Sequence, residues 1–308
     1  MPQLVILRQA TKAVASQGME IAVSVVVSIL FHGLANAMIL YIIAVGLSVT
    51  LGLMGFVNLA HGMFAAAGGY IAVTLMGRLE FPFAAAVILA ALAVALASVP
   101  LERLLYSRLY GAGELEQVLF TIGLIFVSIA VAKYLYGPLA QPFIAPASLT
   151  GQIDLGFRSF PTYRALIIVV GLAIIVALWL TIERTRFGAK VRAAVDNRRM
   201  AQSLGIHTDR LFTLTFALGS GLAALGGAIG AEILPIGPAY ALEHLVYVLI
   251  IVAVGGLGSL RGPFYAALLL GISDTACKYL VPELGAFFIF AAIIVILLWR
   301  PMGLFGRA

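Results

Sequence analysis

The sequence predicts an all-α polytopic membrane protein with eight to ten transmembrane helices, several of them short or broken. Hydrophobic residues make up 63% of its 308 positions, whereas charged residues make up only 10%. Soluble domains of this size do not have such a composition. The apolar residues gather in runs, several of which are near the roughly 20 residues that an α-helix needs to cross the hydrocarbon. No polar segment between the runs is long enough for a soluble domain, so we predict one transmembrane domain.

The N-terminal part of the chain allows two interpretations. Residues 1–18 are mildly basic, and we assign them to a cytoplasmic or interfacial segment that precedes the transmembrane domain of residues 19–308. The small residues after the first apolar run resemble the cleavage site of a secretory signal, but hydrophobicity resumes at once, so we expect no cleavage. We predict instead a first span or half-span, a turn at His32–Gly33 and a second span over 36–54.

Eight further apolar runs follow this segment. The run over 243–256 is short and ends in glycines, which predicts a broken or tilted helix. Counting every run gives ten spans, and merging the doubtful ones gives eight. Either even number places both termini on the same side of the membrane. The runs cover residues 57–77, 83–101, 117–137, 162–182, 211–231, 243–256, 263–281 and 285–299.

One polar island, residues 183–210, interrupts the apolar runs and holds seven of the 19 Lys and Arg residues. Since cytoplasmic loops of membrane proteins carry an excess of Lys and Arg, we place the island in the cytoplasm. The same alternation of spans makes four other segments cytoplasmic, and together with the island they hold 14 of the 19 Lys and Arg. These segments are residues 1–18, 102–116, 257–262 and 300–308.

Within the island, the sequence predicts one or two short helices outside the bilayer. Good helix formers run from Ala189 to Leu204, Gly205 lies where a helix would stop, and Thr208 is placed to cap the next helix. A basic helical surface with a few apolar side chains is suited to docking a soluble partner. The alternative is that the charges only anchor the loop in the cytoplasm.

No residue pattern indicates catalysis, a metal or a cofactor in this chain. The four His residues are scattered without metal-ligand spacing, and Cys277 is the only cysteine. The glycine-rich stretch from Gly255 to Pro263 lacks the Gly-Lys-Ser/Thr of a nucleotide-binding loop and follows a membrane span rather than a strand. The net charge of +6 lies at helix ends and loops, as membrane topology requires, so it does not indicate nucleic-acid binding.

Polar residues within apolar runs are the next candidates for function, because charged and polar groups are costly in the bilayer. Asn58 and His61 lie at a sharp reversal between two spans. They form a polar gate of a translocation path, or else Asn58 caps the next helix as part of a simple turn. The path hypothesis also includes Thr50 and Ser259.

Other polar residues have a structural and a functional interpretation. Asp274 and Lys278 are four residues apart, so they can neutralise each other on one helix face. Glu232 and Glu243 bracket a Pro-rich segment at the outer surface, where they dock a soluble partner, line an entrance or form two solvated helix ends.

The segment from Gly219 to Gly230 is rich in small residues. Its Gly226 and Gly230 have the Gly-x-x-x-Gly spacing that allows two helix backbones to approach closely. The pattern is compatible with a subunit interface and with packing inside the chain.

Several short motifs follow one another along the chain. They are Gly55-Phe-Val-Asn58-Leu-Ala-His61-Gly62, Arg184-Thr-Arg-Phe-Gly188, Arg192-Ala-Ala, Asn197-Arg-Arg-Met-Ala-Gln-Ser-Leu-Gly205-Ile, Gly255-Gly-Leu-Gly-Ser259 with Gly262-Pro263, and Arg300-Pro-Met-Gly-Leu304. In their residues and their order, over roughly residues 33–305, they resemble one family: the permease subunits of branched-chain amino-acid ABC importers, a LivH-like family that includes urea and amide branches.

The resemblance implies that the island is a coupling loop, which docks in a groove of a cytoplasmic ATPase and transmits its closure to the translocation path. The spacing of Ala193-Ala194 to Gly205-Ile206 is similar to the core of the importer coupling motif, although Val191-Arg192 replaces its leading Glu. The coupling residues that it implies are Arg186, Gly188, Lys190, Arg192, Ala193, Ala194, Arg198, Arg199 and Gly205, with Arg192, Arg198 and Arg199 as the expected ATPase contacts.

The partners that the resemblance implies are a second, homologous permease (a heterodimer or a homodimer), two cytoplasmic ABC ATPases that bind ATP and Mg, and a periplasmic substrate-binding protein to which Glu232 and Glu243 would dock. The setting is the bacterial inner membrane, with both termini in the cytoplasm. The expected solute is small and neutral or zwitterionic, such as a branched-chain or other hydrophobic amino acid.

Three alternatives stay open. The stretch Asn197-Arg-Arg-Met-Ala leans toward the urea and short-chain amide branch of the family. An ion-coupled secondary transporter or channel would need an ionisable relay in the membrane, for which only Asp274 and Lys278 are candidates. An intramembrane enzyme would need a catalytic group that no motif supplies.

Overall fold

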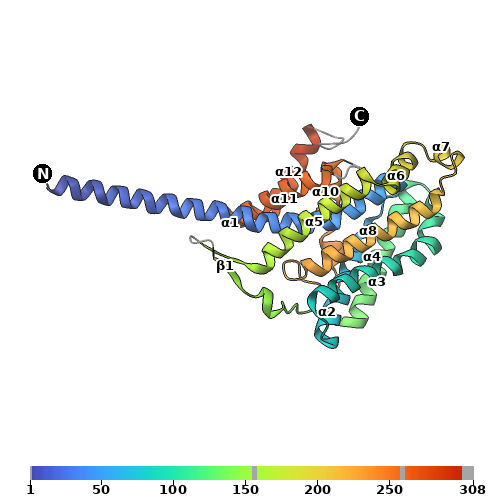
Figure 1. Cartoon of the computed structure of the whole chain (residues 1–308), viewed down its shortest axis with the longest axis horizontal. Coiled ribbons are helices and arrows are strands. Elements are labelled where there is room, and N and C mark those ends of the chain that lie inside the picture. Colours follow the sequence, from blue (N-terminus) through green and yellow to red (C-terminus); the bar gives the residue numbers. More distant parts are fainter. Residues whose placement is uncertain (1, 155–157, 257–260, 300–308) are drawn as a thin grey trace.

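The computed structural model describes residues 2–154, 158–256 and 261–299, which form a bundle of helices with one small hairpin (Figure 1). This confirms the all-α membrane fold. The elements are α1 (Pro2–Met54), η1 (Leu59–His61), α2 (Gly62–Leu79), α3 (Phe83–Leu104), η2 (Tyr106–Leu109), α4 (Glu114–Tyr136), η3 (Ala147–Leu149), β1 (Gln152–Asp154), β2 (Ser159–Pro161), α5 (Thr162–Arg184), α6 (Arg186–Asp196), α7 (Arg198–Ser203), α8 (Thr208–Gly230), α9 (Tyr240–Glu243), α10 (Leu245–Gly255), α11 (Arg261–Leu280), η4 (Pro282–Leu284) and α12 (Gly285–Trp299).

Six helical segments of the described chain are long and apolar enough to cross a membrane. The apolar stretch Tyr240–Gly255 is shorter and is divided between α9 and α10, which confirms the broken helix expected there. The six segments are Val23–Gly52, Leu59–Leu79, Phe83–Leu104, Glu114–Tyr136, Thr162–Arg184 and Thr208–Gly230.

The N-terminal segment is one uninterrupted helix, so the predicted turn at His32–Gly33 is wrong. α1 passes through residue 18 without a break and extends as a rod beyond the bundle (Figure 1). Gly33 has a different role from a turn. A Cβ atom at this position would lie 2.8 Å from the Cα atom of Ile272, so the glycine allows α11 to pack closely on α1.

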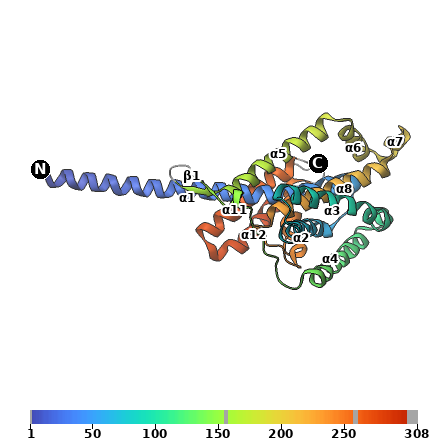
Figure 2. The ribbon, with the colours of Figure 1, turned by 60° about the horizontal axis from the view of Figure 1, so that its bottom comes forward.

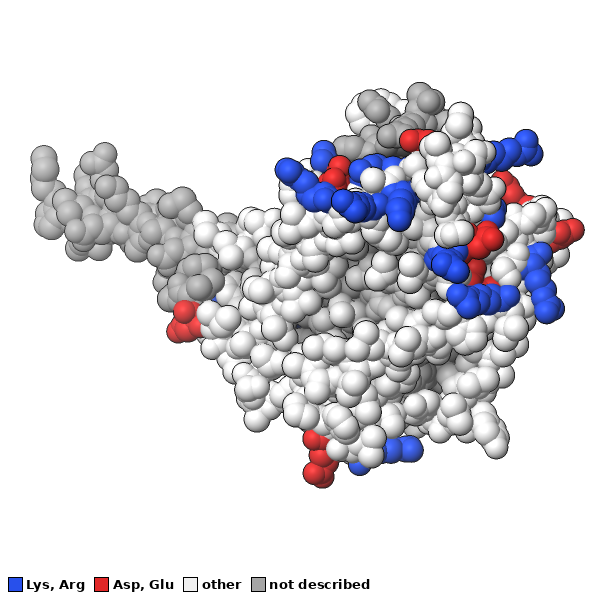
Figure 3. Space-filling view, turned by 45° about the vertical axis from the view of Figure 1, so that its right-hand side comes forward, with Lys and Arg blue, Asp and Glu red and all other residues white. Residues whose placement is uncertain are grey.

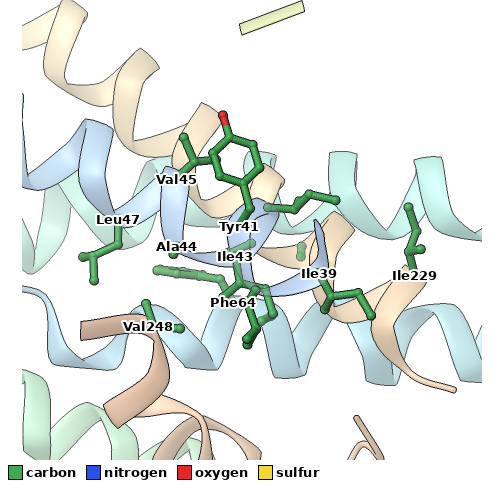
Figure 4. Packing of buried hydrophobic residues seen from close by; sticks show 14 of the residues in the cluster. Ile39, Tyr41, Ile43, Ala44, Val45, Leu47, Phe64, Ile229 and Val248 are labelled. Atoms are coloured by element: carbon green, nitrogen blue, oxygen red, sulfur yellow. The ribbon is translucent and has the colours of Figure 1, made fainter. Parts of the chain in front are cut away.

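The core of the bundle lies around the second half of α1. The hydrophobic side chains between residues 35 and 47 are at most 2% exposed. They pack with side chains of α2, α8 and α10 in one buried cluster, in which Ile39 and Ile43 of α1 lie with Phe64, Ile229 and Val248 (Figure 4). A helix that is apolar and buried on every side is typical of the centre of a bundle.

Glycines bring α8 directly against α1. A Cβ atom on Gly219 would lie 2.8 Å from the carbonyl oxygen of Gly46, and one on Gly46 would overlap the carbonyl oxygen of Gly219. Gly226 and Gly230 face Ile43 and Ile39 of the same helix. The small-residue spacing of α8 therefore serves packing inside the chain.

The helices at the periphery have apolar faces that no part of this chain covers. Only 11% of the most apolar window of α4 and of α5 is buried, and 28% of that of α3. α4 and α5 lie on opposite sides of the bundle (Figure 2). Lipid or another subunit can cover such faces, whereas water would not.

The charged side chains that the structure describes divide between two ends of the bundle, as the sequence predicted, whereas the predicted cytoplasmic segment 300–308 lies outside the described residues. At one end, which we call the platform end after the island 183–210, Tyr110 contacts Phe212 at 5.8 Å between ring centroids and Arg261 lies 3.9 Å from Glu183. At the opposite end, a guanidinium nitrogen of Arg164 lies 2.6 Å from His32 Nδ1. Figure 3 shows most of the visible Lys and Arg side chains above a broad uncharged band, with a smaller charged group below it.

We expect Gly46→Ala to destabilise the bundle, because the added methyl group would overlap the α8 backbone, and overpacking of this kind costs about 1–3 kcal/mol. Gly123→Ala is the matched control, because it also lies within a helix but nothing lies within 4 Å of its missing Cβ atom. Thermal unfolding in detergent should show a lower midpoint for Gly46→Ala only. Equal midpoints for the two variants would contradict this packing role.

Candidate functional site

The island folds into two short helices, α6 and α7, which confirms the sequence prediction; we call residues 183–210 the platform. Thr185 begins α6, where its hydroxyl accepts a hydrogen bond from the Gly188 amide at 3.3 Å. Asn197 begins α7 in the same way, accepting from the Met200 amide at 3.0 Å. Gly205 follows α7 with φ of +80°, a conformation that favours glycine.

The prediction that Thr208 caps α8 is wrong. His207 occupies the cap position and makes no side-chain cap bond. The Thr208 hydroxyl accepts a hydrogen bond from Gln202 Nε2 at 2.8 Å instead, which joins α7 to the start of α8.

Two of the expected coupling residues attach the platform to α5. A Cβ atom on Gly188 would overlap the carbonyl oxygen of Ile182, so only glycine allows α6 to approach the end of α5 this closely. The Arg192 guanidinium donates a hydrogen bond to the same Ile182 carbonyl. These residues therefore fix the angle between the platform and the transmembrane helix.

The inner side of the platform packs on a hydrophobic cluster that reaches the transmembrane helices. Val191, Ala194 and Ala201 of α6 and α7 are buried there against Leu211 and Phe212 of α8. Met54, the last residue of α1, and Tyr110 pack on the same cluster. Through these contacts the platform is joined to both central helices of the bundle.

The outer side of the platform combines positive charge with exposed apolar side chains. Among the described residues, Arg186, Lys190 and Arg199 form no ion pair. Met200 is 60% exposed and Leu204 75% exposed, which is unusual for large apolar side chains. Partner interfaces often bury such Met and Arg side chains.

Arg198 is partly engaged within the chain. Its guanidinium lies 3.2 Å from Asp209 and 4.6 Å from the centroid of the Phe212 ring. Reversing its charge would therefore disturb the platform itself, so Arg199 and Lys190 are better probes of docking. Ala193 is partly buried on α6, between the attached and the exposed sides.

A cavity of about 580 Å³ lies beside the platform and contains a buried carboxylate that the sequence prediction missed. Glu102, only 2% exposed, accepts a hydrogen bond from the Thr213 hydroxyl at 2.8 Å and another from the Tyr110 hydroxyl. Burial and the neighbouring carboxylate raise the pKa of Tyr110, so its hydroxyl stays protonated and donates. Glu102 thus ties α3 and the following turn to α8.

Two irregular segments meet in the middle of the bundle. After α1, the chain turns back through Gly55, whose φ is +61°, to η1. Ala60 of η1 and Ala241 of α9 pack together against Ile125, which is the central residue of α4. The junction therefore lies level with the middle of α4, a helix long and apolar enough to cross a membrane, and discontinuous helices inside such bundles form the sites of many transporters.

Three of the four residues predicted to line the path, Thr50, Asn58 and His61, are buried. His61 Nε2 lies 3.1 Å from the carbonyl oxygen of Ile43, and Asn58 Oδ1 accepts from the Tyr106 hydroxyl at 3.1 Å. The capping role considered for Asn58 is wrong, because its side chain makes no cap bond, and its Nδ2 atom has no partner among the described residues. Thr50 bonds the carbonyl oxygens of its own helix, and Ser259 lies outside the described residues.

Glu232 and Glu243 both lie on the segment that follows α8, at the opposite end from the platform. Both side chains are exposed. Partial burial raises the pKa of Glu232, and the charge of Arg164 opposes this effect. Their role in docking a binding protein stays a prediction.

Asp274, an acidic residue inside an apolar run, forms an ion pair with Lys278. Asp274 is buried and its carboxylate lies 2.7 Å from Lys278 Nζ, on the same face of α11, which supports the structural interpretation. Among the described residues, no group of three or more His, Cys, Asp and Glu could hold a metal ion.

The sequence prediction missed Glu102, and it also missed Tyr106 and Gln117, which form hydrogen bonds with the turn between α1 and α2. The Gln117 side chain accepts from the Val57 amide at 3.1 Å and donates to the Ala112 carbonyl at 3.2 Å. The sequence shows these three side chains as polar residues near the ends of apolar runs. It does not show their hydrogen-bond partners, because those lie far away along the chain.

The chain is similar in sequence to known membrane transport proteins. The family model described as "branched-chain amino acid transport system / permease component" matches residues 29–297. The chain is 28% identical to the high-affinity branched-chain amino acid transport system permease protein LivH of Escherichia coli (strain K12), over 90% of this chain and 94% of the relative. It is also 28% identical to the corresponding BraD of Pseudomonas aeruginosa, over 90% of this chain and 95% of the relative.

A more distant relative is the probable branched-chain amino acid transport permease protein LivH of Methanocaldococcus jannaschii, 25% identical over 78% of each chain. No solved structure matches the chain. With a family model that covers most of its length and a bundle of membrane-spanning helices, the chain belongs to the family of branched-chain amino acid transport permease components.

Proposed function

We propose that this chain is the permease subunit of an ATP-driven importer that carries a small zwitterionic solute, most simply a hydrophobic amino acid, across the bacterial inner membrane. A second, homologous permease would pair with it, two cytoplasmic ABC ATPases would bind ATP and Mg, and a periplasmic binding protein would deliver the solute. The relatives that carry the name LivH or BraD are described as branched-chain amino acid permeases, which supports this solute class.

The observation that carries the proposal is the two-sided platform. Its outer side presents exposed Met200 and Leu204 together with Arg186, Lys190 and Arg199, three cations that form no ion pair with any residue the structure describes. Its inner side packs on the ends of the two central helices. A partner that pushes or pulls the outer side would therefore displace α1 and α8, which is what conversion of ATPase closure into alternating access requires.

The orientation of the chain follows from the same assignment. If the platform is cytoplasmic, the C-terminal end of α1 is also cytoplasmic, because Met54 packs on the platform cluster. α1 then crosses the membrane once, so the proposal places residue 2 outside. This revises the sequence expectation of a cytoplasmic N-terminus, which assumed two spans in this segment.

Charge reversal on the outer side of the platform tests docking. The double variant Lys190→Glu and Arg199→Glu should lose at least about tenfold of the ATPase that co-purifies with the assembled transporter in detergent, because like or unpaired charges would face the ATPase groove. Arg108→Glu, an exposed cation at the same end but outside the platform, should retain it. Undiminished ATPase in the double variant would refute docking at this surface.

Transmission can be separated from docking within one helix. Val191→Ala removes a buried contact between the platform and the transmembrane helices, whereas Val195→Ala removes an exposed side chain of α6. In proteoliposomes we expect Val191→Ala to keep its ATPase but to transport several-fold less solute per ATP hydrolysed, because a loosened contact transmits less displacement. Equal transport-to-hydrolysis ratios in the two variants would show that the cluster does not transmit the movement.

Cysteine labelling tests the orientation. In a Cys277→Ser background, Gln3→Cys should react with a membrane-impermeant maleimide on intact spheroplasts, and Arg199→Cys should react only after the membrane is opened. The opposite pattern would invert the topology. Labelling of neither position before opening would place the N-terminus in the cytoplasm.

A further inference from the structure

A second cavity, of about 520 Å³, opens at the end of the bundle opposite the platform. It lies between the last turns of α4 and the segment that runs from Pro235 into α10. Three kinds of group line it: a cation, Lys133; an anion, Glu243; and an apolar and aromatic wall that includes Pro138, Pro238 and Tyr247. Cavities of this size accommodate small molecules with room to spare.

The two charged residues of this cavity, Lys133 and Glu243, do not form an ion pair with each other. Lys133 and Glu243 both line it, yet neither forms an ion pair with any described residue. One positive and one negative group on the walls of one cavity match a ligand that carries both charges. A solely anionic or cationic ligand would face one like charge.

His244 adds a polar group with a defined direction of hydrogen bonding. Its Nδ1 atom lies 2.9 Å from the carbonyl oxygen of Tyr240. Because a carbonyl oxygen can only accept, Nδ1 carries the proton, so in the neutral form of the ring Nε2 is an acceptor. Beside the Glu243 carboxylate, such an acceptor suits an ammonium group, and the Tyr247 ring on the next turn offers a further surface for a cation.

The position of the cavity connects it to the junction in the middle of the bundle. Glu243 is the last residue of α9, and Ala241 of the same short helix packs on Ala60 of η1. Ala241 also lies against Gly62, where a Cβ atom would come within 3.0 Å of its carbonyl oxygen. A displacement of η1 would therefore also displace α9, whose Glu243 lines the cavity.

We propose that this cavity binds a zwitterionic solute with an α-amino acid head group, Lys133 pairing with its carboxylate and Glu243 with His244 receiving its ammonium group. The proline and tyrosine wall then faces the apolar side chain of the solute. This proposal rests on the proposed transport function and gives Glu243 a role in solute binding, in place of docking a binding protein. The phosphoethanolamine head group of a lipid carries the same pair of charges and is the other source of this chemistry.

The test is protection of a cavity residue from labelling in the assembled transporter. Ala140→Cys, in a Cys277→Ser background, places a thiol on an exposed position of the cavity wall. An uncharged maleimide should label it more slowly when L-leucine is present. Leucinamide, which lacks the carboxylate, and 4-methyl-2-oxopentanoate, which lacks the ammonium group, should protect at least about tenfold less well, as expected for the loss of a charged hydrogen bond.

Variants of the cavity charges complete the test. Lys133→Gln and Glu243→Gln should each weaken protection by L-leucine about tenfold or more. Arg78→Gln and Glu80→Gln, which remove exposed charges of α2 and its C-cap, should leave it unchanged. Protection that is insensitive to Lys133→Gln and Glu243→Gln, or absent for every amino acid tried, would overturn the proposal.

The membrane composition separates the two sources of a zwitterion. If nanodiscs with phosphatidylethanolamine slow the labelling without added amino acid, and nanodiscs with phosphatidylglycerol do not, the cavity holds a lipid head group and the solute assignment is overturned. ATPase co-purification is scored on the same preparations. A transporter that retains its ATPase but shows no protection would refute the cavity alone, whereas loss of both would count against the proposed function.

Discussion

The close approach of α1 and α8 is the constraint on which the rest of this molecule depends. Gly46 and Gly219 have no side chain between them, and the backbones touch where any larger residue would separate them. Without a hydrophobic driving force between helices in lipid, such van der Waals contact is a main source of association. The contact makes α1 and α8 one mechanical unit. α1 ends and α8 begins at the hydrophobic cluster of the platform, so a force applied there acts on the centre of the bundle rather than on its edge.

Polar groups reinforce this arrangement at the ends of the helices, where their cost in the bilayer is lowest. Glu102 joins α3 to α8 through hydroxyl donors, and Gln117 satisfies the backbone of the turn between α1 and α2. Asp274 is neutralised by Lys278, which leaves it unsuited to act alone as a proton relay. Glu102 and Gln117 thus hold separate elements of the bundle together.

The sequence predicts the membrane fold and the platform well, because both depend on local properties: apolar runs of spanning length, a cluster of basic residues, helix formers and a stop at Gly205. It fails where a residue acts through a distant partner. Gly33 suggested a turn, but its role is set by Ile272 on α11, and Asn58 suggested a cap, but it bonds Tyr106. Gly188 was predicted as a coupling residue from the resemblance alone, and the close α5 backbone gives the physical reason for a glycine there. No local pattern could reveal the cavity at Glu243, whose cation comes from α4.

The two irregular segments explain how movement at one end could change binding at the other. A continuous helix between the platform and the outer cavity would transmit displacement as a rigid rod. Here α1 ends at Met54, which packs on the platform cluster, and the chain then turns at Gly55 and continues into η1. η1 packs on α9, whose Glu243 lines the cavity. A turn with φ of +61° at a glycine, near a buried Asn58 whose Nδ2 atom has no partner among the described residues, is less rigid than a helix and can adopt a second arrangement at low cost. Under the proposed transport function, this break is the element whose two positions would alternately support and release a bound solute.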